Sequence, residues 1–166
     1  MRIFASLISA LATVFFVGCA SGNDLTLGTI GPQLPQPAGV STATGSLVVY
    51  SAFETGAAFN SRNESGQSYS DYKIFTSEGR LLQQVHNDSG TMEPSPVAVR
   101  LTPGKYTVVA QANGYASVTV PVIIAAHQST ILHLEGGGVW SGESAFNQTN
   151  SVRLPDGMVV GWKSGS

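Results

Sequence analysis

Apolar residues between positions 45 and 135 recur in short alternating runs rather than at helical spacing. In one run, Val97, Val99 and Leu101 would share a face of a strand, because successive side chains of a strand point to opposite faces. Similar β-prone runs cover residues 47–53, 72–76, 80–85, 106–112, 118–124 and 130–134. Short runs repeated about every 8–12 residues predict an all-β sandwich or barrel.

Turn residues separate these runs. Pro103-Gly104 precedes the run 106–112, and Asn113-Gly114 follows it. Asn-Gly is a strong hairpin signal because both residues tolerate positive φ, so a type I′ turn is expected there. Pro121 lacks a backbone donor, which predicts that its strand is bulged or at a sheet edge.

The order of these features resembles the end of a carboxypeptidase regulatory-like or PEGA-type domain. The similarity lies in residues 101–108 (LTPGKYTV), Gly114-Tyr115, residues 120–123 (VPVI) and residues 130–134 (TILHL). It implies a small immunoglobulin-like or prealbumin-like antiparallel β-sandwich over residues 45–135. Such modules are commonly accessory, non-catalytic domains of exported proteins. Independently of the resemblance, we expect Tyr106 and Tyr115 to pack across the sandwich with their hydroxyls at the surface.

Residues 1–18 have the composition of a signal peptide. Arg2 supplies a positive charge, and residues 3–17 form an apolar stretch. This stretch is shorter than the about 20 residues that a membrane-spanning helix needs. It ends at Phe16-Val17-Gly18-Cys19, which resembles a lipobox, with Phe16 in place of the usual Leu.

The lipobox resemblance implies cleavage before Cys19 and attachment of lipid to its thiol. Cys19 is the only cysteine, so no internal disulfide competes for it. The expected location is the bacterial cell envelope, and Ala20 in place of Asp implies sorting to the outer membrane. The alternative is an ordinary cleaved signal peptide with an incidental cysteine.

Residues 19–44 read as a lipidated N-terminus followed by a flexible linker. This segment is rich in proline and glycine and contains neither lysine nor arginine. Proline removes backbone donors and glycine raises the entropy cost of ordering. The alternative is that residues 25–30 form an edge strand on the sandwich.

Residues 136–166 read as a glycine-rich connection and a C-terminal β-hairpin. Pro155-Asp156-Gly157 provides the turn, and Met158, Val160 and Trp162 alternate after it. The hairpin is expected over 151–163 because it could cover an open sheet edge. The polar residues 54–70 form an insertion of undetermined role.

The composition offers little chemistry. Only 11% of residues are charged and the net charge is −2, which argues against a nucleic-acid binder. His86, His127 and His133 lack the spacing of metal ligands, and His133 is expected to face solvent between two leucines. No Gly-x-Ser-x-Gly motif occurs. We therefore expect no enzyme, cofactor or metal.

Two functions remain open at this point. The first is a membrane-anchored envelope lipoprotein whose sandwich is a non-catalytic binding or structural module. Its expected partners are the membrane, through the lipid, and an envelope protein or polysaccharide. The second is a carbohydrate-binding module, whose candidate stacking residues are Trp140, Trp162, Tyr50 and Tyr69. Two coplanar exposed rings would favour sugar binding, and buried rings would favour a scaffold.

Overall fold

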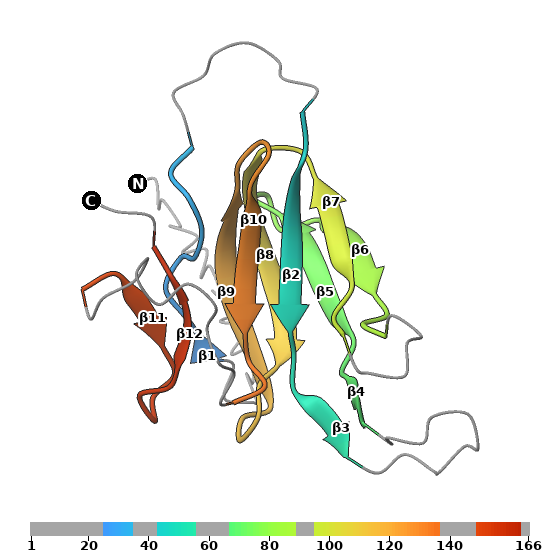
Figure 1. Cartoon of the computed structure of the whole chain (residues 1–166), viewed down its shortest axis with the longest axis vertical. Coiled ribbons are helices and arrows are strands. Elements are labelled where there is room, and N and C mark those ends of the chain that lie inside the picture. The colour runs from blue at the N-terminus through green and yellow to red at the C-terminus, as the bar shows by residue number, and fades with distance from the viewer. Residues whose placement is uncertain (1–24, 35–42, 56–66, 89–94, 137–148, 164–166) are drawn as a thin grey trace, which may run out of the picture.

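The computed structural model describes residues 25–34, 43–55, 67–88, 95–136 and 149–163. These residues form a sandwich of two β-sheets with two short strand pairs at its margins (Figure 1). They contain no α-helix, and therefore no helix long and apolar enough to cross a membrane. The predicted all-β sandwich is confirmed. The signal-peptide stretch 1–18 lies outside the described residues.

The larger sheet has five strands in the order β1-β9-β8-β5-β6. Their bounds are β1 (Leu25–Thr26), β9 (Ser117–Ile124), β8 (Gly104–Gln111), β5 (Tyr72–Thr76) and β6 (Leu81–Val85). The strands from β9 to β6 pair antiparallel, while β1 pairs parallel with β9. The alternation in the sequence is realised here, because Val118, Val120, Val122 and Ile124 are all buried.

The smaller sheet has three strands in the order β10-β2-β7. They are β10 (Ser129–His133), β2 (Gly45–Tyr50) and β7 (Ala98–Leu101). The β2–β7 pair is antiparallel, and the β2–β10 pair is parallel. The two marginal pairs are β3 (Phe53–Thr55) with β4 (Gln67–Tyr69), and β11 (Ser151–Arg153) with β12 (Val159–Trp162).

The chain changes sheets at the corner between β7 and β8. There the Tyr106 hydroxyl donates to the Thr102 carbonyl at 2.9 Å, four residues earlier in the chain. A tyrosine that bonds back to the backbone at a sheet-changing corner is a hallmark of immunoglobulin-type sandwiches. The ring of Tyr106 packs against the core, as expected, and its hydroxyl fixes the Pro103-Gly104 turn.

Residues 25–34 correct the linker prediction, and the edge-strand alternative describes them instead. Leu27 and Ile30 are buried in the core, and the segment follows β9. The Leu27 amide donates to the Thr119 carbonyl at 2.8 Å, and the Ile30 amide to the Pro121 carbonyl at 2.9 Å. The Pro121 nitrogen also faces the N-terminal segment, but it carries no proton. The hydrogen bonds between this segment and β9 are therefore interrupted between Leu27 and Ile30.

The β8–β9 connection differs from the expected two-residue hairpin. It spans residues 112–116, and the Tyr115 amide donates to the Ala112 carbonyl at 2.9 Å. Gly114 has a φ of 80°, whereas Asn113 does not have a positive φ. A positive φ at the third turn position alone matches a type II turn, while type I′ needs it at both central positions.

The C-terminal hairpin is confirmed, and it packs on the N-terminal segment. β11 and β12 pair antiparallel, and the Gly157 amide donates to the Leu154 carbonyl in the turn. The Gly31 amide donates to the Trp162 carbonyl at 3.0 Å, which fastens residues 25–34 to β12. The N-terminal segment therefore lies between β9 and the hairpin, and all three share one core.

Candidate functional site

The residues singled out from the sequence do not form one site. Cys19 and Trp140 lie outside the described residues. Tyr50 and Tyr69 come together where β2 and β4 end, and Trp162 lies on β12 beside the N-terminal segment.

The two tyrosines do not form a flat platform. Their ring centroids are 5.6 Å apart, but the ring planes are 86° from parallel. Tyr69 is only 8% exposed, and Phe53 stacks on its ring at 4.7 Å. The expectation that Tyr50 and Tyr69 could present coplanar rings to a sugar is therefore wrong for this pair.

A second contact corrects the expectation that His133 faces solvent. His133 lies opposite Tyr50 in the parallel register of β10 and β2. The imidazole stacks on the Tyr50 ring at 4.2 Å with 7° between the planes. Its Nδ1 also lies 2.6 Å from Oε1 of Glu135, and the exposed fraction of the His133 side chain is 13%. Tyr50 therefore covers the histidine instead of leaving it open to water.

Glu135 is the least expected member of this group. The residue is 7% exposed, and its Oε2 is buried without a hydrogen-bond partner. Its backbone carbonyl accepts a hydrogen bond from the side-chain amide of Asn113. The backbone amide of Asn113 donates to the Leu134 carbonyl at 2.8 Å. The Leu134 amide in turn donates to the Tyr50 carbonyl at 2.6 Å. These backbone contacts fix the position of the carboxyl group at the end of β10.

We call Tyr50, Phe53, Tyr69, His133 and Glu135 the aromatic–acid cluster. Burial, the Glu135 carboxylate and Tyr50 together raise the pKa of the Tyr69 phenol. The cluster combines stacked rings, an imidazole and a carboxylate oxygen that can accept one more hydrogen bond. Tyr50, Phe53 and His133 are partly exposed, so an outside group would meet the rings and the imidazole, whereas Oε2 of Glu135 is buried beneath them.

The sequence does not reveal the aromatic–acid cluster, because its members meet only through the pairing of distant strands. Alternation with Leu132 and Leu134 correctly assigns His133 to the outer face of its strand. Whether that face is covered depends on which strand lies beside β10. The parallel β2–β10 pairing, over a separation of more than 80 residues, brings Tyr50 there. A strand that ends in His-x-Glu was the available signal, but it does not name its aromatic partner.

Trp162 belongs to a different surface. It lines a cavity of about 140 Å³ together with Ile30, Pro32 and residues 128–131. The tryptophan is half-buried rather than displayed as a platform. A half-buried ring of this kind favours the scaffold alternative over sugar stacking for Trp162.

A larger groove of about 300 Å³ lies on the outer face of the five-stranded sheet. Its walls include the polar side chains of Asp71, Lys73, Gln84, Gln111 and Ser117. Small-molecule sites are mostly enclosed and apolar, with volumes from about 300 to 1,000 Å³. This groove is at the lower limit of that range and lies open on the sheet surface instead of being enclosed, so the aromatic–acid cluster remains the stronger candidate.

Asn87, which follows β6, holds the two sheets together. It is fully buried, and its side-chain amide donates to the Val49 carbonyl at 2.9 Å and to Ser51 Oγ at 3.0 Å. Its side-chain oxygen accepts from the Val97 amide at 3.0 Å. Because every polar atom of the side chain is bonded within the fold, we assign it a structural role.

Across the described part of the chain, no three His, Cys, Asp or Glu side chains converge as metal ligands would. Comparison of the chain with known protein families, with curated proteins and with solved structures finds no match.

Proposed function

We propose that the chain is a bacterial envelope lipoprotein, anchored through lipid on Cys19, whose β-sandwich is a non-catalytic binding or structural module. One observation carries the anchor. The only cysteine of the chain stands directly after Gly18, where a 15-residue apolar stretch ends. A thiol at that position is what lipid attachment at a signal-peptide cleavage site requires.

The energetics of lipid insertion support a lasting anchor. Each buried CH₂ contributes about 0.8 kcal/mol, and a single acyl chain binds a membrane only marginally. Lipoproteins of the type that the lipobox resembles carry two or three chains. Ala20 in place of Asp supports outer-membrane sorting.

The aromatic–acid cluster is the part of the sandwich best suited to meet an envelope partner. Its partly exposed members, Tyr50, Phe53 and His133, offer stacking surfaces and an imidazole at one end of the sandwich. Sugar binding is the weaker candidate, because Tyr50 and Tyr69 are perpendicular and Tyr69 is buried. An enzyme is weaker still, since Tyr50 covers one face of the imidazole in the His133–Glu135 pair.

The anchor is tested by comparing wild type with Cys19→Ala in cells. Wild-type protein should take up labelled palmitate and fractionate with membranes, and the variant should do neither. Ser9→Ala, a substitution inside the apolar stretch that keeps the thiol, is the matched control and should behave as wild type. If Cys19→Ala stays with the membranes and wild type takes up no label, the anchor proposal is wrong.

The binding role is tested by affinity capture from intact envelopes. His133→Gln removes the stacked imidazole of the cluster, and His86→Gln changes an exposed histidine elsewhere. Capture of a specific envelope component should fall with His133→Gln and remain unchanged with His86→Gln. Equal recovery with all three proteins would assign the cluster a purely structural role.

A further inference from the structure

The chain joins the sandwich at one defined end. Leu25 pairs with Val118, the second residue of β9, and Thr26 pairs with Thr119. This position is beside the loop 112–116, where β8 ends and β9 begins. Figure 1 shows β1 at the same end of the molecule as β3, whereas residues 33–34 lie toward the opposite end.

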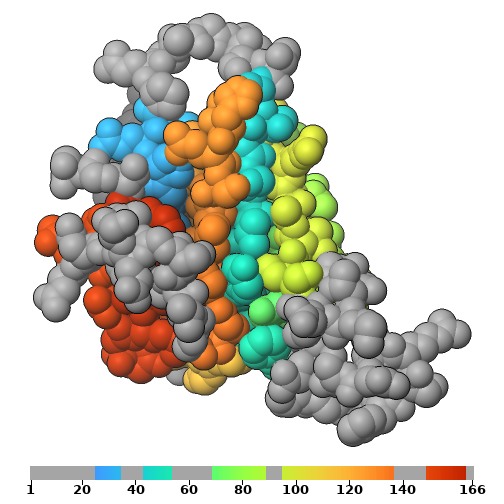
Figure 2. Space-filling view, in the orientation of Figure 1, coloured from blue at the N-terminus to red at the C-terminus, as the bar shows by residue number. Residues whose placement is uncertain are grey.

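The segment that follows this junction cannot act as a free tether. Leu27 and Ile30 are buried, and hydrogen bonds join residues 27–31 to β9 on one side and to β12 on the other. The space-filling view shows the N-terminal segment and the C-terminal hairpin side by side as one continuous body (Figure 2). Only the residues before Leu25 can separate the sandwich from its anchor.

That separation is short. Five residues lie between Cys19 and Leu25 in the sequence, so six Cα–Cα steps connect them. A fully extended chain covers at most about 3.3–3.6 Å per residue, which limits the distance to roughly 20 Å. A free linker as far as Thr44 would have reached several times farther.

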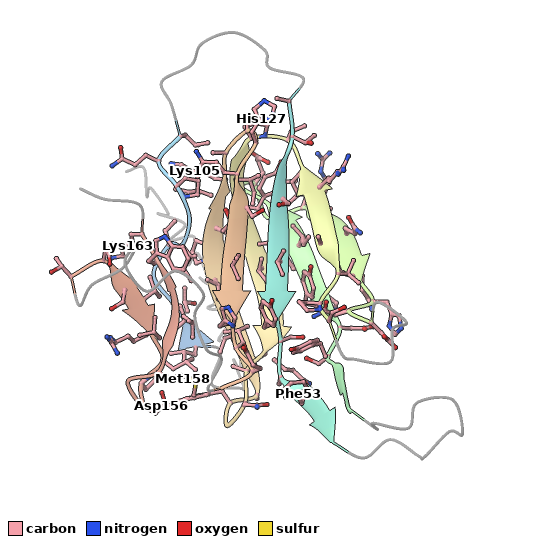
Figure 3. The ribbon with its side chains drawn as sticks, viewed as in Figure 1. Phe53, Lys105, His127, Asp156, Met158 and Lys163 are labelled. Carbon is pink, nitrogen blue, oxygen red and sulfur yellow. The ribbon has the colours of Figure 1, made fainter. Side chains whose placement is uncertain are left out.

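We propose that the sandwich stands on the bilayer with the loop 112–116 and the turn 155–157 facing the lipid surface. This inference rests on the proposed anchor at Cys19 and adds an orientation to it. The eight residues of β9 extend over about 26 Å, so in this orientation the opposite end lies well beyond the headgroups. Figure 3 shows Phe53, Asp156 and Met158 at the bilayer-facing end, and Lys105 and His127 at the other.

The surface at the near end is compatible with this position. The loop 113–116 is uncharged, the turn 155–157 carries one exposed acidic residue, Asp156, and the aromatic–acid cluster lies at the same end of the sandwich. Aromatic residues are well suited to the boundary between headgroups and water. The far end, with the turns 77–79 and 125–128, then points away from the bilayer.

Lipidation of Cys19 makes a clean labelling experiment feasible. Because the natural thiol is consumed, one introduced cysteine is the only site for a thiol-reactive dye. Ala116→Cys labels an exposed position of the near loop, and Gln128→Cys labels an exposed position at the far end. Both full-length lipidated proteins are placed in vesicles of phosphatidylethanolamine and phosphatidylglycerol that contain a nitroxide-headgroup lipid.

We expect loss of fluorescence at position 116 and none at position 128. A 20-residue Gly/Ser insertion after Ser21 is the matched control, and it should abolish the difference by freeing the sandwich. Equal loss at the two positions, or greater loss at 128, overturns the orientation while leaving the anchor intact. If the full-length protein does not float with the vesicles, both the anchor and the orientation are refuted.

Discussion

Ile30 and Gly161 provide the sharpest test of how the two ends of the chain pack together. Ile30 is 2% exposed and lies between β9 and β12. Buried Ile→Ala substitutions typically cost about 2–5 kcal/mol, so Ile30→Ala should lower the free energy of unfolding by about 3 kcal/mol. For a domain of this size that corresponds to a fall in Tm of roughly 6–12 °C.

Gly161→Ala perturbs the same contact from the opposite side. A Cβ at position 161 would lie 2.6 Å from Cδ1 of Ile30 and 2.8 Å from its Cγ2. Both distances are shorter than a van der Waals contact and Ile30 is 2% exposed, so overpacking should cost about 1–3 kcal/mol. In the Ile30→Ala background the new methyl group enters vacated space. The two costs should therefore be non-additive by about 1 kcal/mol or more.

The assay is chemical denaturation of a soluble form that starts at Ala20, with the double-mutant cycle completed from four proteins. Thr29→Ala, an exposed neighbour in the same segment, is the control and should leave the midpoint unchanged. If Ile30→Ala behaves like Thr29→Ala, residues 25–34 do not dock. If both substitutions destabilise but their costs add, the segment docks without contacting the hairpin.

Four further predictions address other parts of the fold. Gly114→Val should cost roughly 1 kcal/mol or more, because a β-branched residue is strained at a φ of 80°; an unchanged denaturation midpoint would contradict the turn assignment. Asn87→Ala should cost about 2–4 kcal/mol by leaving buried backbone groups unpaired, as measured by denaturant melts. Burial raises the pKa of the Tyr72 phenol in the folded state. The contribution of Tyr72 to the free energy of unfolding should therefore be constant up to the unfolded-state pKa of about 10 and fall above it. Tyr72→Phe removes a buried hydroxyl without a partner and should reduce that alkaline loss in pH-dependent melts without lowering stability at neutral pH. Truncation after Gly138 should lower stability. In the intact chain the Val160 amide should exchange far more slowly than in the unfolded chain, and equal rates would count against docking of the hairpin.

Strands with regular alternation could be predicted from the sequence. The runs 97–101, 106–112 and 118–124 place their apolar residues inward as expected. Alternation specifies a face but not a neighbour, because pairing depends on contacts between residues far apart in the chain. The parallel pairing of β2 with β10, and with it the Tyr50–His133 stack, therefore could not be predicted.

The N-terminal segment was misread because its own pattern is irregular. Leu25 and Leu27 alternate, but Ile30 breaks the period of two. The break lies where Pro121 on the neighbouring strand offers no donor. A short irregular segment gains its order from the strand it docks on, and its local propensity gives no sign of this.

Mass spectrometry of the mature protein tests the central claim most directly. The account predicts that the N-terminal peptide begins at Cys19 and carries a diacylglyceryl group on its sulfur. Recovery of an N-terminus beyond Cys19, or of an unmodified Cys19 in membrane-derived protein, would contradict it.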